Sequence, residues 1–358
     1  MNNIINIGYT VSNKYANCLA VSMASILKNS GDEEFNFYIL NADMTDENRR
    51  KIEVLKKIKP FNIEYVQMNN DDFKNMSEGI SVVSNYRLKI SSLFPNLDKI
   101  LFLDSDIIAL TSLKELYETP LDDYYIASVV DPGVKLQYEY TINDKEKFPD
   151  RRFNTGVMLA NLKKWREDNM EEKLFEGMLW YSSVYQIWPD QNVLNMVFKD
   201  YIYELPYTYN FCPILYQEGL YQELKFDKIN VEELKIVHWA GGPKPWETND
   251  VLKSLLDVRA PIFVEYSKLD KAKVFMNDIF WEYARLTPYY EDFMYTYIQG
   301  QNEKFRKEIA SCIKISKILK NEYLKVRFLT NITLGKKKKH YQEKKAKIKQ
   351  YLKILSEY

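Results

Sequence analysis

Short apolar runs alternate with amphipathic helical patterns over the first hundred residues, and this alternation restricts the fold more than any other feature. Four runs have the length and composition of strands, at 4–8, 35–40, 62–67 and 99–103. The segments between them predict helices over 15–28, 46–59 and 86–93, with Thr45 as the N-cap of the second. Strands joined by crossover helices form a mainly parallel sheet with helices on both faces. The pattern therefore predicts an α/β fold that binds its ligands beyond the carboxyl ends of the strands.

The rest of the chain divides into a mixed part and a helical part. Helices are predicted at 162–170 and 190–198, and after about residue 269 the pattern is overwhelmingly helical and increasingly basic. With 358 residues, 46% of them hydrophobic, the chain has ample apolar surface for a large core. We expect one α/β domain over 1–268 and a helical, basic C-terminal region over 269–358.

Charge is unevenly distributed, although 50 Lys and Arg balance 50 Asp and Glu. Residues 303–358 contain 17 Lys and Arg and five Glu, a net charge of +12, so the preceding chain carries −12. A basic tail with interleaved apolar residues is typical of attachment to an anionic membrane surface. Ile348, Tyr351, Leu352 and Leu355 fall at helical spacing, as expected of a face that inserts or packs. The alternative is a solvated helix that docks on the acidic body, and no nucleic-acid readout motif accompanies the charge.

Three widely spaced cysteines, Cys18, Cys212 and Cys312, form neither a CxxC pair nor a disulfide framework. The N-terminal segment lacks a basic region followed by a long apolar run, and no stretch reaches the roughly 18 apolar residues of a membrane span. We therefore expect a cytoplasmic protein that is peripheral at the inner face of the plasma membrane.

Two carboxylates directly follow the fourth predicted strand, in the motif LDSD. In extended backbone, Asp104 and Asp106 share a face and lie roughly 7 Å apart, so both can reach one cation. Such a cation can bridge the phosphates of a nucleotide diphosphate and neutralise the charge of the leaving group. Acid pairs at this spacing also arise by chance in a chain with 50 acids, and it is the position at a strand end that favours a metal site.

One of the two histidines is a candidate third ligand. His340 lies in the basic tail, whereas His238 begins the motif HWAGGPKPW at the end of a predicted strand. The glycines allow backbone amides to approach phosphate oxygens, and Lys244 adds a positive charge. A structural histidine with satisfied hydrogen bonds is the alternative. Oxygen ligands with one imidazole favour Mn²⁺ over Ca²⁺, and Mg²⁺ is the alternative to manganese.

Two further segments are interpreted as active-site loops, at 152–162 and 188–195. The first places Asn154, Thr155 and Gly156 where an amide and close backbone can hold a sugar hydroxyl. The second places Asp190 and Gln191 at a helix start, where an ordinary N-cap is the alternative interpretation.

Taken together and in this order, these segments resemble glycosyltransferase family 8, retaining enzymes that include bacterial lipopolysaccharide galactosyl- and glucosyltransferases and glycogenin. The resemblance covers about residues 4–265 and rests on four ordered motifs, LDSD, FNTG, DQ and HWAGGPKPW. It implies a GT-A fold, a UDP-sugar donor, and manganese held by Asp104, Asp106 and His238. It also implies transfer of a hexose, glucose or galactose, to a glycan, glycolipid or glycoprotein acceptor.

The same resemblance implies further roles within the site. Donor contacts fall on Thr10, Asn13, Tyr15, Arg87, Ser105, Asp131, Asn154, Thr155, Gly156, Gly241 and Lys244, and catalytic positions on Asp190 and Gln191. Within that set, Gly241 and Lys244 would meet the diphosphate, and Asn154, Asp131 and Asp190 the sugar. Gln191 would lie beneath the anomeric carbon. An amide is a weak nucleophile, which favours front-face attack over a covalent intermediate.

Ser12 departs from the family pattern, which commonly has an acidic residue there that contacts uracil and ribose. Asn13 and Tyr15 are then the remaining candidates for contacts to the base. The departure keeps open a sugar-nucleotide-binding homologue that acts as a partner subunit without strong catalysis. An aspartate-nucleophile phosphatase is a second alternative, since that class also places Asp-x-Asp after a buried strand, but it leaves the HWAGGPKPW motif unexplained.

Overall fold

A computed structural model describes residues 3–73, 76, 82–131, 151–184, 189–213, 231–240, 244–246, 278–332 and 335–354. The chain forms two compact units: the first contains the described residues up to Pro245 and those of 278–292, and the second contains Trp246 and the described residues from Phe293 onward. The domain boundary predicted at residue 268 lies outside the described residues.

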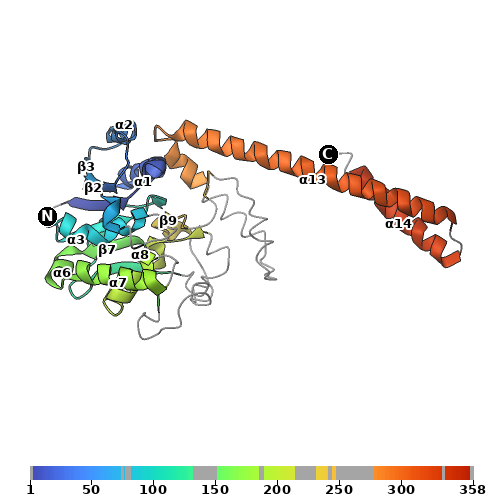
Figure 1. The fold of residues 1–358 in the computed structure, drawn as a ribbon. Helices are drawn as coiled ribbons and strands as arrows, with labels where there is room; N and C mark the ends of the chain where they lie inside the picture. Colours follow the sequence, from blue (N-terminus) through green and yellow to red (C-terminus); the bar gives the residue numbers. More distant parts are fainter. Residues whose placement is uncertain are drawn as a thin grey trace. The chain divides into compact units, whose positions relative to one another are not determined.

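The first unit is built on a seven-stranded sheet in the order β3-β2-β1-β4-β7-β6-β8 (Figure 1). The strands are β1 (Ile4–Thr10), β2 (Glu34–Asn41), β3 (Asn62–Gln67), β4 (Lys99–Leu103), β6 (Ile126–Val130), β7 (Phe153–Asn161) and β8 (Ile202–Leu205). Strands β3, β2, β1 and β4 are parallel, and β8 is parallel to β6. Strand β7 runs antiparallel to both β4 and β6. The predicted α/β fold with a mainly parallel, mixed sheet is confirmed.

Strand β7 corrects the interpretation of 152–162 as a loop. Its nine residues are buried except the last, and they pair with strands on both sides. Helices cover both faces of this sheet, so the buried residues of the central strand β7 form a continuous run in place of the alternation that marks a strand with one exposed face. The polar Asn154 and Thr155 at its start suggested a loop, but they lie at the sheet edge where β4 ends.

The helices and 3₁₀ helices of the first unit connect these strands. They are η1 (Asn13–Tyr15), α1 (Ala16–Asn29), α2 (Asp46–Glu53), η2 (Val54–Lys57), η3 (Asn70–Phe73), η4 (Val82–Lys89), α3 (Ile90–Leu93), α4 (Lys114–Tyr117), α6 (Leu162–Glu167), α7 (Met170–Val184), α8 (Pro189–Phe198), η5 (Tyr207–Tyr209) and η6 (Val231–Glu233). Thr45 is the N-cap of α2, as predicted, because its side chain accepts a hydrogen bond from the amide of Asn48.

Three predicted helices differ from the structure in their ends or type. The second ends as α-helix at Glu53 and continues as η2, because the Val54 amide bonds three residues back and tightens the turn. The third is mostly 3₁₀ helix, η4, before the short α3. The helix predicted to reach residue 170 stops at Glu167, because Asn169 adopts a positive φ of 52° and turns the chain into α7.

Helices cover both faces of the sheet, with α1 and α2 on one side and α6 and α7 on the other (Figure 1). Phe102 of β4 and Met158 of β7 belong to one buried cluster with Trp165 of α6, Leu174 of α7 and Leu194 of α8. This apolar layer fixes the sheet edge at which β4 ends and α8 begins, and the polar side chains of the site lie at that edge.

A second, two-stranded sheet pairs β5 (Ile107–Ala109) with β9 (Ile236–His238) in antiparallel fashion. Its register aligns Ile107 with His238, and the amide of Trp239 donates to the carbonyl oxygen of Asp106 at 3.1 Å. Strand β5 follows β4 after three residues, so this pairing brings the HWAGGPKPW motif next to the LDSD motif.

The second unit contains most of α13 (Tyr290–Ile332) and all of α14 (Gly335–Ile354). Lys344 of α14 pairs with Glu322 of α13 at 2.8 Å, and Ile348 and Val326 are buried at 6% and 1% exposure. Ile348 is therefore covered by protein, which favours packing over insertion for this position, whereas the side chains of Tyr351, Leu352 and Leu355 lie outside those described. Among the described residues, no helix is both long and apolar enough to cross a bilayer.

Candidate active site

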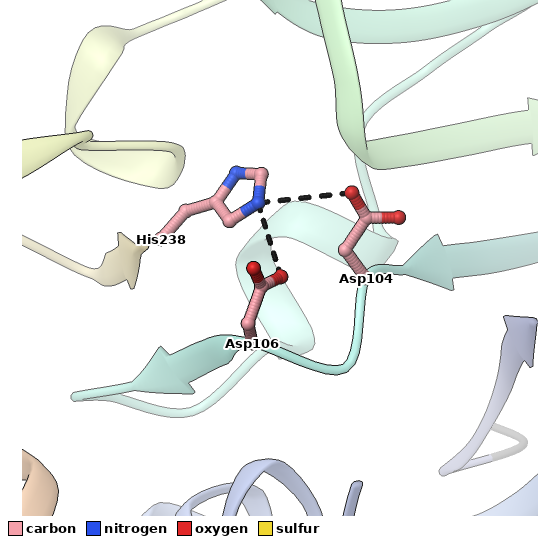
Figure 2. A group of neighbouring side chains, drawn as sticks. All are labelled: Asp104, Asp106 and His238. Atoms are coloured by element: carbon pink, nitrogen blue, oxygen red, sulfur yellow. Dashed lines mark ion pairs between the residues drawn. The ribbon is translucent and has the colours of Figure 1, made fainter. Parts of the chain in front are cut away.

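Asp104, Asp106 and His238 meet where the two sheets adjoin. Asp104 directly follows β4, Asp106 directly precedes β5, and His238 is the last residue of β9 (Figure 2). One ligand atom from each of the three lies within 4.8 Å of the other two. The Nε2 atom of His238 is 3.3 Å from Asp106 Oδ1 and 3.7 Å from Asp104 Oδ2. The acid pair and the imidazole selected from the sequence therefore converge in one small volume.

Gly156 leaves the space in which this cluster fits. It belongs to β7, and its carbonyl oxygen accepts a hydrogen bond from the amide of Asp104 at 2.8 Å. A Cβ atom at this position would lie 2.8 Å from Asp104 Oδ2 and would overlap the His238 ring. Glycine is required here for close approach, because any larger residue would push a carboxylate or the imidazole out of place.

Two cationic side chains pair with the acids of the cluster. Arg87 donates from Nη2 to Asp104 Oδ1 at 2.6 Å, and Lys244 donates from Nζ to Asp106 Oδ2 at 2.5 Å. Lys244 also bonds to the carbonyl oxygen of Trp239, which anchors it beside β9. Each carboxylate therefore faces His238 with one oxygen and a basic side chain with the other.

The cluster is strongly polarised in this structure. Burial acts to raise the pKa of the Asp106 carboxyl, but His238 and Lys244 outweigh burial and hold that pKa well below its ordinary value of 3.8. Burial acts to lower the pKa of His238, but the Asp106 carboxylate outweighs it and raises that pKa well above 6.5. A proton on the imidazole therefore occupies the position that a divalent cation would take.

Arg87 links the cluster to the start of α8. Its buried guanidinium lies 3.5 Å from Asp190 Oδ2 through Nε, and Nη1 donates to the carbonyl and hydroxyl oxygens of Thr155 at 2.9 and 3.3 Å. Burial raises the pKa of Asp190, and Arg87 partly offsets this effect. One planar, charged side chain thus holds Asp104 and Asp190 in a fixed relation.

Two amide side chains contact the carboxylate of Asp131, which follows β6 on the other side of β7. Gln191 Nε2 donates to Asp131 Oδ2 at 2.9 Å, and Asn154 Nδ2 approaches the same oxygen at 3.3 Å. Gln191 Oε1 accepts from the Thr155 amide at 3.3 Å. Asp131, Asn154 and Gln191, each assigned to the sugar or the anomeric centre from the resemblance, are therefore brought together.

The residues assigned to the nucleoside end lie beyond β1. Thr10 ends that strand, and Tyr15 is 43% exposed at the start of α1. The Asn13 side-chain oxygen accepts hydrogen bonds from Thr45 and from Asn48 Nδ2, at 2.7 Å from the latter, so it organises the start of α2. Ser105 lies between the two clustered aspartates, and Gly241 falls outside the described residues.

The sequence profile described as Glycosyl transferase family 8 matches residues 6–250, well over half of the chain. The chain belongs to glycosyltransferase family 8. An Escherichia coli lipopolysaccharide 1,2-glucosyltransferase is 28% identical over 251 residues, which cover 67% of this chain and 73% of that protein. A Haemophilus influenzae protein with a provisional assignment as a glycosyltransferase is 31% identical over 215 residues, and the match covers 58% of this chain and only 64% of that relative's length.

Solved structures agree with membership of family 8. The galactosyltransferase LgtC, in complex with donor and acceptor sugar analogues, has 26% identity and a TM-score of 0.59, over 74% of this chain and 99% of LgtC. An LgtC variant in which an active-site glutamine is replaced by glutamate has 27% identity and a TM-score of 0.59, over 71% of this chain and 94% of that chain. The similarity to LgtC confirms the GT-A-like fold.

The donor set of this family 8 site fits a divalent cation. Two carboxylates and one imidazole supply negative oxygen ligands and a nitrogen ligand from three rigid strand ends, which is the chemistry expected for Mn²⁺ or Mg²⁺. Sequence reasoning missed Asn210, which bonds to the His238 ring. The spacing gave no clear signal, because Asn210 comes five residues after the end of β8, whereas Asp131 directly follows the parallel neighbour β6.

Proposed function

We propose that this family 8 chain is a retaining, metal-dependent hexosyltransferase. It transfers glucose or galactose from a UDP-sugar to a glycan, glycolipid or glycoprotein acceptor. The observation that carries the proposal is the convergence of Asp104, Asp106 and His238 within 4.8 Å at the end of β4. Names of relatives support the choice of hexose, since one is a glucosyltransferase and another a galactosyltransferase.

Asp104, Asp106 and His238 would hold Mn²⁺, with Mg²⁺ as the alternative. When bound, the cation neutralises charge on the diphosphate leaving group. Lys244 is within reach of the same region and would add a positive charge to the β-phosphate, together with the backbone at Gly241. Arg87 would act on the donor by keeping Asp104 oriented, since its buried guanidinium already spans two acids.

The sugar would lie over Asp131, Asn154 and Asp190, with Gln191 beneath the anomeric carbon. The Gln191 amide is oriented through both of its polar atoms, to Asp131 and to the Thr155 amide. An oriented amide can stabilise positive charge at the anomeric carbon without forming a covalent bond. The acceptor hydroxyl then attacks on the face that the diphosphate leaves, its proton passes to a departing phosphate oxygen, and configuration is retained.

The test is a panel of UDP-sugars screened for hydrolysis with and without Mn²⁺. Metal-dependent release of UDP from UDP-glucose or UDP-galactose is the expected result, and Asp106→Asn, with folding intact by circular dichroism, should lose it. Release of phosphate from monoesters instead would identify the aspartate-nucleophile phosphatase. Neither activity, with UDP-sugar still bound, would identify a silent binding homologue.

The basic C-terminal unit is proposed to hold the enzyme at an anionic membrane surface, where a lipid-linked acceptor would be found. Lys339, Lys344, Lys347 and Lys349 of α14 are all exposed. Exposed lysines remain available to anionic headgroups, whereas the buried Ile348 does not. This arrangement supports electrostatic attachment, and the location that we propose is the cytoplasmic face of the plasma membrane.

A further inference from the structure

Asn210 lies beside the imidazole of His238 in the candidate metal site and is 1% exposed. It is the C-cap of the short η5 helix, and its backbone amide donates to the Tyr207 carbonyl oxygen at 3.1 Å. The next residue, Phe211, forms a parallel bridge with Val237 of β9, and the His238 amide donates to the Phe211 carbonyl at 2.9 Å. Backbone hydrogen bonds on both sides therefore hold Asn210 in a fixed position next to His238.

The hydrogen bonds of this region determine which atom of each side-chain amide is the oxygen. The backbone amide of Gly156 can only donate, and it lies 3.0 Å from one atom of the Asn154 side chain, which must therefore be the oxygen Oδ1. The same oxygen lies 2.8 Å from the Asn210 side chain, so the Asn210 atom that faces it must be the nitrogen Nδ2.

The imidazole tautomer follows from the same logic. Since Nδ2 of Asn210 faces Asn154, its Oδ1 is the atom 2.9 Å from His238 Nδ1. A carbonyl oxygen only accepts, so Nδ1 must carry a proton and donate it. The opposite nitrogen, Nε2, is the one that faces Asp106 and Asp104. Once the Nε2 proton has left, the lone pair of Nε2 is therefore directed at a ligand shared with the two carboxylates.

The chain of amides continues to the sugar side of the site. Asn154 presents Nδ2 to Asp131 Oδ2 at 3.3 Å, and Gln191 donates to the same oxygen at 2.9 Å. Asn210, Asn154 and Asp131 are all buried, so water does not compete for these contacts. A displacement of Asn210 would therefore disturb both the imidazole and the residues proposed to hold the hexose.

We propose that Asn210 is a positioning residue that fixes the Nδ1-protonated form of His238 for metal binding and couples this ligand to the sugar-binding side chains through Asn154. The inference rests on the proposed metal-dependent function. Partners that orient a metal-bound histidine typically contribute about 10- to 100-fold to metal affinity. Asn210 Oδ1 accepts from Nδ1 at 2.9 Å, and the buried Cys212 thiol, which also interacts with the His238 side chain, lies 3.9 Å from the same oxygen.

Two substitutions separate the two contacts of Asn210. Asn210→Leu keeps the approximate volume but removes both the acceptor for His238 and the donor for Asn154. Asn210→Asp keeps an acceptor for the Nδ1 proton and removes only the donor. Asn210→Ser, which is too short to reach His238, is the second deletion variant if the leucine variant does not fold. Asn192→Leu is the matched control, because Asn192 is a buried amide that bonds to Arg152 and Tyr181.

Mn²⁺ affinity of the full chain is measured without nucleotide, by electron paramagnetic resonance of free Mn²⁺. We expect Asn210→Leu to bind Mn²⁺ about 10- to 100-fold more weakly, and Asn210→Asp and Asn192→Leu to stay within about threefold of wild type. Asn210→Asp should instead weaken UDP-sugar binding at saturating Mn²⁺. Unchanged Mn²⁺ affinity in Asn210→Leu, or equal losses in the leucine and aspartate variants, would overturn the inference.

A spectroscopic readout tests the hydrogen bond itself. The chain has two histidines, so selective ¹⁵N labelling of histidine gives signals from two imidazoles. The signals that remain in the His340→Gln variant belong to His238. With Zn²⁺ as a diamagnetic substitute, wild type and Asn210→Asp should show a slowly exchanging Nδ1 proton on His238, which Asn210→Leu should lose. A slowly exchanging Nδ1 proton in wild type and in both variants would contradict the assignment. Absence of Mn²⁺ binding in wild type would instead overturn the proposed function.

Discussion

The ammonium of Lys244 lies 2.5 Å from Asp106 Oδ2, so a candidate phosphate ligand is paired with a candidate metal ligand. A divalent cation that joins the cluster must share the Asp106 carboxylate with this positive charge. Lys244→Met should therefore raise the Mn²⁺ affinity of the nucleotide-free protein, on the order of tenfold, because a repulsive charge is removed from a low-dielectric site. The same change should lower UDP affinity, because the diphosphate loses a cation.

Titrations of Mn²⁺ and of UDP against the Lys244→Met variant measure both effects. Lys164→Met is the control, because Lys164 of α6 pairs with Asp168 at 3.3 Å. The contacts described for Lys164 include no residue of the cluster. If Mn²⁺ affinity falls in Lys244→Met, the ammonium supports the metal site and does not compete with it.

The raised pKa of His238 predicts a pH dependence of stability. Because the pKa in the folded protein lies above 6.5, the ion pair with Asp106 stabilises fully below pH 6.5 and is lost as pH rises through the folded pKa. The melting temperature of protein treated with EDTA should therefore fall as pH rises from about 6.5. With Mn²⁺ present, the stabilisation by metal should grow over the same range, because the cation displaces the imidazole proton.

Differential scanning fluorimetry from pH 6 to 9, with EDTA or Mn²⁺, checks these two trends. His238→Gln should abolish both, so the difference between wild type and variant isolates this residue from other titrating groups. An identical pH profile in wild type and His238→Gln would show that the imidazole carries no charge in the folded protein.

Gly156→Ala should damage the metal site while leaving the fold intact. The added methyl would lie 2.8 Å from Asp104 Oδ2 and within the space of the His238 ring, so a ligand must move. We expect Mn²⁺ affinity to fall by about tenfold or more, measured by calorimetric titration. Gly177→Ala in α7 is the control, because its methyl would meet the side-chain methyl groups of Met196, Val197 and Val193 at 3.1 to 3.3 Å and no ligand of the cluster. Equal Mn²⁺ binding in both variants would refute the steric argument.

Arg87→Met should destabilise the protein by about 3 kcal/mol in urea unfolding, because a buried guanidinium is removed from between two carboxylates. Arg87→Lys keeps the charge but not the planar fork, and should be intermediate. The control Lys89→Met removes a partly exposed pair with Asp72 and should cost less than about 1 kcal/mol. Adding Asp190→Asn to Arg87→Met should recover part of the stability, because it removes the buried carboxylate that has lost its partner. No recovery would mean that Asp190 is not the unpaired charge that destabilises Arg87→Met.

Neutralising three exposed lysines of α14, Lys339, Lys347 and Lys349, to Gln should weaken binding to vesicles that contain phosphatidylserine. Each lysine near an anionic surface contributes about 1 kcal/mol, so the partition coefficient should fall by roughly a hundredfold at low salt. The control replaces Lys56, Lys163 and Lys173 of the first unit, which are also exposed. Equal losses in both triple variants would indicate a general charge effect, and the α14 attachment would be withdrawn.

Local sequence patterns predicted most elements of the first half of the sheet. Strands β3 and β4 match their predicted ends, and Thr45 caps α2 as expected. These features depend on alternation, side-chain capping and breakers such as Pro60, all of which act over a few residues. Strand β7 and the break at Asn169 were not predicted, because a strand covered on both sides loses its alternation and a single positive φ leaves no periodic signal.

The sequence by itself determined the chemistry of the site: two acids after a buried strand, one histidine before a glycine-rich turn, and the amides at the starts of β7 and α8. Only the tertiary structure decided how these groups face one another. The pairing of β5 with β9 aims His238 Nε2 at the acids, and Arg87, Lys244 and Asn210 take positions that no spacing predicts. The reason is physical, because hydrogen bonds between distant strands and the charges in a buried cluster depend on contacts that local sequence does not encode.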